Sequence, residues 1–209
     1  MSGETMREPR WPALVAMVAA GCVYAALPEP LSLGPSWGLV AVVLVLMVPI
    51  FVSHARGRYD VARILTFVVN GAIMLAMIAS LIFLIQGLPK HAEPPKSLLR
   101  SASALWVTNI LVFALWYWKL DGGGPTGRER AKGRWKRSFM FPQMVMPGAD
   151  TSWSPQFMDY LFLAFNTSTA FSPTDTSVLS RWAKVGMMLQ AMISLSIVAL
   201  LAARAVNIL

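Results

Sequence analysis

The hydroxyl-rich stretch at residues 166–176 (NTSTAFSPTDT) contains the side chains of this sequence that are best suited to binding an ion. Hydroxyl groups recur in it at short intervals, and a carboxylate follows them near its end. Oxygen atoms of this kind can replace part of a cation's hydration shell, and carboxylates repeated around an axis form a ring that attracts cations. We therefore predict a pore-lining or filter segment. Its candidate residues are Thr167, Thr169, Ser172, Thr174 and Asp175.

Further polar residues around this stretch are candidates for supporting a pore, namely Asp159, Asn166, Arg181 and Gln190. Two interpretations of Asp175 remain open, because a carboxylate there either binds ions or caps the next helix and pairs with Arg181. Asp159 also suits the first turn of a helix, where the helix dipole favours a negative charge. Gln190, like Asn109, is expected to hydrogen-bond between helices, with cavity lining as the alternative.

The sequence contains no constellation typical of an enzyme. His54 and His91 lie far apart and Cys22 is the single cysteine, so neither a histidine-based metal centre nor a multi-thiolate zinc site is expected. Ser, His and Asp residues do not cluster, and no glycine-rich phosphate-binding motif is present. We predict a protein that is not an enzyme and that uses no cofactor or metal.

The residues before the hydroxyl-rich stretch predict a short helix that carries it into a membrane. Ser154 is a suitable N-cap, and Pro155 suits the first helical position. The apolar segment that ends at Phe165 is about 16 Å long as a helix, which is half a bilayer. The polar residues 166–176, broken by Pro173, would then return to the surface as non-helical chain. We therefore predict a re-entrant half-helix and loop, followed by a full-length helix.

The composition indicates an all-α integral membrane protein. Of its 209 residues, 56% are hydrophobic and 13% are charged, and the mean hydropathy is +0.57, whereas a soluble domain carries about 25% charged residues. A spanning helix needs about 20 apolar residues, and five stretches qualify. They are residues 11–27, 37–52, 64–88, 101–118 and 185–203. We expect residues 1–96 to form a three-helix peripheral region and residues 97–209 a pore-like module of helix, basic loop, half-helix and inner helix.

The distribution of Lys and Arg predicts the orientation in the lipid bilayer. With five crossings, 14 of the 18 Lys and Arg residues fall on the face that carries the N-terminus, and four fall on the other. Positive residues accumulate on cytoplasmic segments. The N-terminus is therefore expected in the cytoplasm, and the membrane is expected to be a bacterial inner membrane. The basic run at 128–137 is expected to be a solvated loop facing lipid, with no nucleic-acid partner.

Residues 153–203 resemble the pore module of the potassium-channel superfamily, in which an aromatic-rich pore helix, a Thr-rich turn and a Gly-Tyr-Gly-Asp filter precede an inner helix. Aligned without gaps, Phe165 matches the aromatic residue of the pore helix. Thr167 and Thr169 match the filter-entry threonines, and Asp175 matches the terminal aspartate. The resemblance implies a homo-oligomer, with a tetramer favoured, around a central pore for a small cation.

The filter differs from that family, because Ser172-Pro173-Thr174 stands where Gly-Tyr-Gly is found. Filter glycines allow backbone geometries that direct carbonyl groups to the axis, and Ser, Pro and Thr do not adopt these geometries cheaply. We expect a wider, partly hydrated path lined by hydroxyl groups. Potassium channels enter their pore loop from outside, whereas the charge distribution puts this loop inside. Either the pore is inverted or the basic loop departs from the charge rule.

The segments 171–176 (FSPTDT) and 181–184 (RWAK) also look like a group of uncharacterised bacterial membrane proteins, a resemblance that implies no function. Two functional hypotheses stay open. The first is a channel-like oligomer that permeates cations, and the second is a non-conducting membrane scaffold or sensor with the same architecture. The last predicted helix is expected to line the oligomer axis, because small residues such as Gly186 and Ser194 allow close approach of helices.

Overall fold

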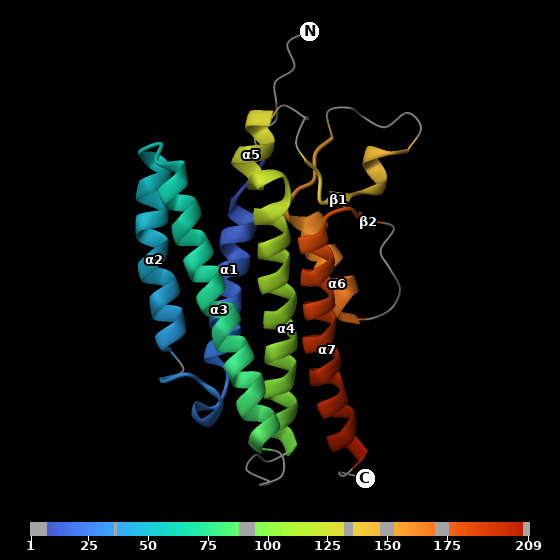
Figure 1. The fold of residues 1–209 in the computed structure, drawn as a ribbon. Coiled ribbons are helices and arrows are strands. Elements are labelled where there is room, and N and C mark those ends of the chain that lie inside the picture. The colour runs from blue at the N-terminus through green and yellow to red at the C-terminus, as the bar shows by residue number, and fades with distance from the viewer. Residues whose placement is uncertain are drawn as a thin grey trace.

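A computed structural model describes residues 8–35, 37–87, 95–131, 136–146, 153–169 and 176–206, with the side chains of all of them except 95 and 204–206. Over these ranges the chain is a bundle of helices (Figure 1). The α-helices are α1 (Trp11–Ala25), α2 (Gly38–Ala55), α3 (Tyr59–Gly87), α4 (Pro95–Leu120), α5 (Gly124–Ala131), α6 (Phe157–Thr169) and α7 (Arg181–Val206). The short 3-10 turns are η1 (Glu29–Leu31), η3 (Asp121–Gly123) and η4 (Pro142–Met144), and the strands are β1 (Phe139–Met140) and β2 (Ser177–Val178).

The long helices confirm an all-α protein of the membrane class. Within the described ranges, four segments are long and apolar enough to cross a bilayer, and they contain α2, α3, α4 and α7. Helix α1 is apolar but has only 15 residues. Large apolar side chains on the outside of the bundle remain exposed, with Val45 at 67%, Leu75 at 68% and Leu195 at 68%. Such a surface suits contact with lipid.

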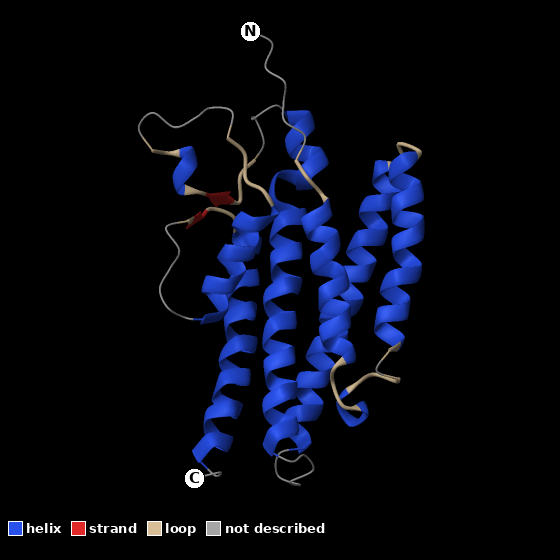
Figure 2. Cartoon of the chain, turned by 180° about the vertical axis from the view of Figure 1, so that it is seen from behind, coloured by secondary structure: helices blue, strands red, loops and turns tan. Residues whose placement is uncertain are grey.

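Helix α4 lies at the centre of the bundle. It packs against α1 and α3 on one side and against α6 and α7 on the other, while α2 packs against α1 and α3. Figure 1 shows that α1 begins and α7 ends at opposite ends of the bundle. Figure 2 shows from behind that α5, β1 and β2 gather at the N-terminal end.

The two strands hold the beginnings of α6 and α7 together. Strands β1 and β2 pair antiparallel, with Phe139 opposite Val178. The ring of Phe139 lies 6.1 Å from that of Tyr160, in the first turns of α6, and 5.9 Å from that of Trp182, at the start of α7. Both helices therefore begin at the same end of the bundle and run side by side from there.

The short helix α6 differs in its limits from the predicted half-helix. It begins at Phe157, after Ser154 and Pro155, and it continues through Thr169 instead of ending at Phe165. The extra turn forms because its polar side chains bond back to carbonyl groups one turn earlier, so they do not interrupt the helix. The amide of Asn166 donates to the Phe162 carbonyl at 2.8 Å, and the hydroxyl of Thr169 donates to the Phe165 carbonyl at 3.2 Å.

A glycine turn at the end of α4 redirects the chain into α5. Gly122, Gly123 and Gly124 have φ angles of 59°, 79° and 78°, a region that residues with a side chain rarely adopt. A Cβ atom on Gly124 would also lie 2.9 Å from the carbonyl oxygen of Lys119. The turn kinks the chain, and α5 continues beyond the end of α4 (Figure 1).

Candidate functional site

The carboxyl end of α6 lies beside the middle of α7. Ser168, one residue before the end of α6, contacts Gln190, which is the tenth residue of the 26-residue α7. Nine residues of helix correspond to about 14 Å along α7. Ser194, the fourteenth residue of α7, bonds to the Ser168 carbonyl, so the contacts of Ser168 extend to the middle of α7. Since both helices begin at the same end, α6 enters the bundle from that end and stops about half-way along its neighbour (Figure 1).

Gln190 connects three helices through its side-chain amide, and it is fully buried. Its nitrogen donates to the carbonyl oxygen of Ala164 at 2.7 Å and to the hydroxyl oxygen of Ser168 at 2.8 Å, both on α6. Its oxygen accepts a hydrogen bond of 2.7 Å from the hydroxyl of Tyr117 on α4. The expected interhelical hydrogen bonding of Gln190 is therefore confirmed.

Two residues of α4 and one of α7 complete this cluster. The amide of Asn109 donates to the Gln190 carbonyl at 3.3 Å and to the Ser168 hydroxyl at 3.4 Å. The indole of Trp106 donates to the hydroxyl of Ser194 at 3.1 Å, and that hydroxyl donates to the carbonyl of Ser168. Buried polar groups that satisfy one another in this way fix the position of a helix end. We refer to Trp106, Asn109, Tyr117, Ser168, Gln190 and Ser194 as the α6 clasp.

The clasp gives two of the small residues on α7 a role within the chain. Ser194 contacts α6 and α4 within the chain, and a Cβ atom on Gly186 would meet the ring of Tyr117 at 3.4 Å. These two positions therefore serve packing inside one protomer. The outward face of α7 instead carries large side chains such as Met192 and Leu195, which are 67% and 68% exposed.

The predicted lining residues of α6 lie on its last turns. Thr167 bonds to the Leu163 carbonyl at 2.8 Å, and Thr169 bonds to the carbonyls of Phe165 and Asn166. The side chains of Asn166, Thr167 and Thr169 are half-exposed. They lie at the same depth as the clasp, but they are less buried than Ser168, and these side-chain hydrogen bonds stay within α6.

The other predicted site residues divide into two groups. Ser172, Thr174 and Asp175 lie outside the described residues, as does the predicted pairing of Asp175 with Arg181. Arg181 is the first residue of α7, and its side chain is exposed. Asp159 lies in the first turn of α6, where its carboxylate accepts a hydrogen bond of 2.7 Å from the backbone N–H of Gln156. This geometry is that of a helix cap.

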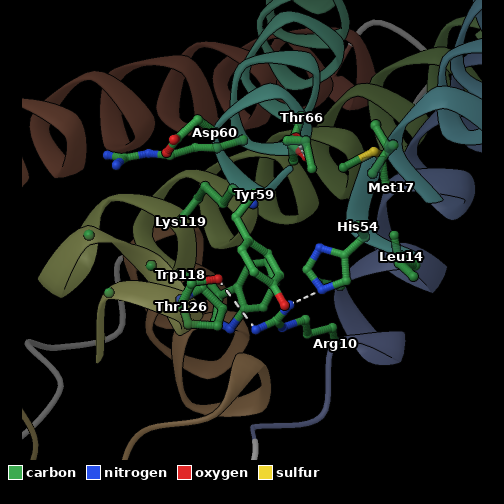
Figure 3. Close-up of a pocket in the computed structure, with 18 of the residues that line it drawn as sticks. Arg10, Leu14, Met17, His54, Tyr59, Asp60, Thr66, Trp118, Lys119 and Thr126 are labelled. Carbon is green, nitrogen blue, oxygen red and sulfur yellow. Dashed lines mark hydrogen bonds between the residues drawn. The ribbon is translucent and has the colours of Figure 1, made fainter. Parts of the chain in front are cut away.

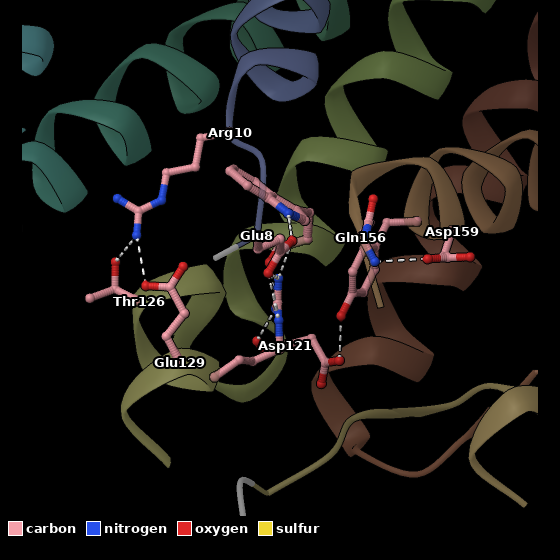
Figure 4. A network of polar contacts seen from close by, with 10 residues as sticks. Glu8, Arg10, Asp121, Thr126, Glu129, Gln156 and Asp159 are labelled. Atoms are coloured by element: carbon pink, nitrogen blue, oxygen red, sulfur yellow. Dashed lines mark hydrogen bonds and ion pairs between the residues drawn. The ribbon is translucent and has the colours of Figure 1, made fainter. Parts of the chain in front are cut away.

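A buried ion pair at the N-terminal end of the bundle was not predicted from the sequence. Arg128 donates to both carboxylate oxygens of Glu8, at 2.9 Å and 2.8 Å, and only 3% of its side chain is exposed. Arg128 also donates to the carbonyls of Trp118 and Asp121, and the indole of Trp118 donates to Glu8 (Figure 4). Burial raises the pKa of the Glu8 carboxyl, and the adjacent guanidinium of Arg128 opposes that rise.

This ion pair corrects the interpretation of the basic run as a solvated loop at Arg128 alone, since Arg130 and Lys136 in the same run are exposed. Arg128 is buried because the glycine kink sets α5 against the end of α4, where the carbonyls of Trp118 and Asp121 accept its hydrogen bonds. Three consecutive glycines after an apolar helix were the signal for a break in the helix. Nothing in the spacing indicated that Glu8, 120 positions away, supplies the counter-charge.

The same network positions the start of α6. The carboxylate of Asp121 is fully buried and accepts hydrogen bonds of 2.7 Å from the N–H of Ser138 and from the hydroxyl of Tyr160. The guanidinium of Arg128 lies 5.3 Å from the centre of the Tyr160 ring. Helix α6 is thus held at its amino end by this network and at its carboxyl end by the clasp.

Within the described part of the chain, no group of three or more His, Cys, Asp or Glu residues is arranged to hold a metal ion. The arrangement at α6 instead brings a helix carboxyl end, an amide and two hydroxyl groups to the depth of the middle of α7.

Comparison of the chain with protein-family models, with curated proteins and with solved structures found no match.

Proposed function

We propose that the protein is an oligomeric, channel-like membrane protein in which α6 is a re-entrant half-helix. Its carboxyl end borders a hydrated path for small cations. One observation carries the proposal, namely the half-exposed polar side chains of Asn166, Thr167 and Thr169 at the depth of the middle of α7.

The depth of these side chains supports a polar surrounding. The middle of a spanning helix lies in the hydrocarbon core, where polar groups without partners are costly. The back-bonds of Asn166 use its amide nitrogen and leave its amide oxygen without a partner among the described residues. Water or a second subunit at this face would supply the missing hydrogen bonds.

The direction of α6 supports a preference for cations. The carboxyl end of a helix carries about half a negative elementary charge, and discontinuous membrane helices use such ends to coordinate cations. The residues that continue the chain from this end add hydroxyl groups and one carboxylate. The lining residues that we propose are Thr167, Thr169, Ser172, Thr174 and Asp175.

The proposal includes a fifth crossing by α1. As a helix its 15 residues are about 22 Å long, which is shorter than a bilayer core of about 30 Å. Its support is the packing of α1 against α2 and α4, and the start of α1 and the end of α7 at opposite ends of the bundle (Figure 2). The 14-to-four distribution of Lys and Arg favours a cytoplasmic N-terminus in a bacterial inner membrane.

We propose a homo-oligomer, with the tetramer that the potassium-channel resemblance implies, whose subunits meet at the outer face of α6 and α7. Exposed apolar side chains continue from one helix to the other on this face. They are Met158, Phe162 and Phe165 on α6 and Val185, Met188 and Met192 on α7. Between them lie the polar last turn of α6 and the proposed path.

Tracer flux into liposomes tests the function. Purified protein in proteoliposomes is expected to admit Na⁺, K⁺ or Rb⁺ faster than protein-free liposomes do. Thr169→Val and Asp175→Asn are expected to reduce this flux several-fold. Thr66→Val is a matched control, because the Thr66 hydroxyl on α3 also bonds to a carbonyl four residues earlier and α3 packs mainly on α2 and α4. Absence of flux for every monovalent cation in folded, oligomeric protein would contradict conduction.

A non-conducting scaffold or sensor is the second candidate, and the α6 clasp favours it. The amide of Gln190 donates a hydrogen bond to the hydroxyl of Ser168, so these two polar groups bind one another and hold the end of α6 against α7. In this alternative the end of α6 anchors the bundle, and the oligomer axis is closed by apolar side chains or lipid. Wild-type protein without flux, together with an oligomer that has a blocked axis, would support it.

A further inference from the structure

A cavity of about 300 Å³ lies between α1, α2, α3 and the junction of α4 with α5 (Figure 3). It is at the N-terminal end of the bundle, and none of its lining residues belongs to α6 or α7. Its volume is at the lower limit of about 300–1,000 Å³ that is usual for ligand pockets. The cavity is therefore separate from the proposed cation path.

Positive charge dominates the polar part of the cavity. Its lining includes four cations and one carboxylate, namely Arg10, Arg63, Lys119, Arg130 and Asp60. The ring of His54 and the hydroxyl groups of Tyr59 and Thr126 add hydrogen-bonding groups. Figure 3 shows Arg10, His54, Tyr59 and Thr126 converging on one region of it.

Three of these cations lack a carboxylate partner in the described part of the chain. Arg10 pairs with Glu129 at 3.1 Å and also donates to His54. Among the described residues, no carboxylate lies within ion-pair distance of Arg63, Lys119 or Arg130. Each of the three instead lies 5.6 Å from the centre of an aromatic ring. The cavity therefore holds an excess of positive charge that an anion would balance.

The deeper part of the cavity is apolar. It is lined by Ala13, Leu14 and Met17 on α1 and by Ile50 and Phe51 on α2. From Arg10 to Met17 the lining extends about 10 Å along α1 at about 1.5 Å per residue. One side of the site is thus cationic at the helix ends, and the other is apolar toward the middle of the bundle.

We propose that this cavity binds the phosphate-bearing head group of an anionic membrane lipid. Arg63, Lys119 and Arg130 contact the phosphate, and the apolar part receives the glycerol backbone and the first acyl carbons. Basic pockets between membrane helices bind anionic head groups through this combination. A soluble phosphate offers the same charged group to the cations, but it has no apolar part to contact the apolar lining.

Ligand-dependent unfolding in neutral detergent tests the proposal. The probes are short-chain phosphatidylglycerol, phosphatidylcholine with the same chains, and inorganic phosphate, each titrated against the thermal midpoint of the full chain. We expect phosphatidylglycerol to bind at least tenfold more tightly than the other two. Lys119→Gln and Arg130→Gln are expected to weaken that binding about fivefold each. Arg58→Gln is the matched control, because it removes an exposed arginine at the same end that does not line the cavity.

The outcomes are distinct. Equal affinity for the two phospholipids would overturn the proposal, and so would wild-type affinity in both Lys119→Gln and Arg130→Gln. Inorganic phosphate that binds as tightly as phosphatidylglycerol would assign the cations to a soluble anion and overturn the lipid. A loss of binding in Arg58→Gln equal to that in Lys119→Gln would show a general charge effect and would also contradict the site. Each variant is first shown to unfold cooperatively without ligand, and if Lys119→Gln does not fold, Arg63→Gln replaces it.

Discussion

The side-chain amide nitrogen of Gln190 lies 2.8 Å from the hydroxyl oxygen of Ser168, which joins the middle of α7 to the last turn of α6. Gln190→Leu removes this bond and leaves the Tyr117 hydroxyl without its acceptor. We expect the free energy of unfolding to fall by about 1–3 kcal/mol. Tryptophan fluorescence during unfolding in detergent measures it. Gln86→Leu, at an exposed position near the end of α3, is expected to change it little; equal effects of the two variants would contradict the clasp.

The buried pair of Glu8 and Arg128 predicts a strong effect of removing one partner. Arg128→Met leaves a carboxylate buried without its cation, and we expect a loss of about 3–5 kcal/mol in the free energy of unfolding. The exposed Lys136 offers a control, since Lys136→Met is expected to have almost no effect. The double variant Glu8→Leu with Arg128→Met is expected to regain part of the stability. If Arg128→Met lowers the free energy of unfolding no more than Lys136→Met does, the ion pair is absent from the protein in the membrane.

The apolar lengths of the long helices made most of the fold predictable. The stretches predicted at 37–52, 64–88, 101–118 and 185–203 correspond to α2, α3, α4 and α7, because an uninterrupted apolar run in a bilayer has few alternatives to a helix. The helices extend beyond these runs, since their end turns carry charged residues that hydropathy excludes.

The contacts that position α6 were predictable only in part. A polar residue inside an apolar helix, such as Gln190, indicates an interhelical hydrogen bond, but its partners depend on the rotation and depth of the neighbouring helices. The predicted limits of α6 were wrong, because the polar residues Asn166 and Thr169 indicate the end of a helix by their type, whereas their side chains bond within the helix. The Glu8–Arg128 pair joins residues far apart in sequence, and only the packed structure brings them together.

Replacing a glycine by alanine is expected to have opposite effects on the free energy of unfolding at Gly127, in α5, and at Gly71, in α3. A Cβ atom on Gly127 would overlap the carbonyl oxygen of Gly122, so Gly127→Ala is expected to cost about 1–3 kcal/mol of unfolding free energy. A Cβ atom on Gly71, inside α3, meets no atom within 4 Å. Gly71→Ala is therefore expected to stabilise the protein by about 0.5–1 kcal/mol. Thermal unfolding of both variants checks the prediction, and a neutral Gly127→Ala would contradict the glycine turn between α4 and α5.

The proposed crossings predict which loops share a side of the membrane. On a Cys22→Ser background, cysteines at Arg58 and Ser177 are expected to be protected from a membrane-impermeant thiol reagent applied to intact cells. A cysteine at Leu33, which is 55% exposed between α1 and α2, is expected to react. Permeabilised cells serve as the control for reactivity. The reverse pattern would restore the potassium-channel orientation, and reaction of all three would contradict five crossings.

Water access at Thr169 tests the central claim most directly. A spin label at this position, again with Cys22→Ser, is compared in liposomes with one at Leu75, an exposed apolar position within the long helix α3. Power saturation with oxygen and with a water-soluble nickel chelate measures exposure to lipid and to water. We predict that the label at Thr169 is more accessible to the nickel chelate than to oxygen, while the label at Leu75 is accessible mainly to oxygen. A label at Thr169 that is accessible only to oxygen would place the carboxyl end of α6 in lipid and contradict the hydrated path.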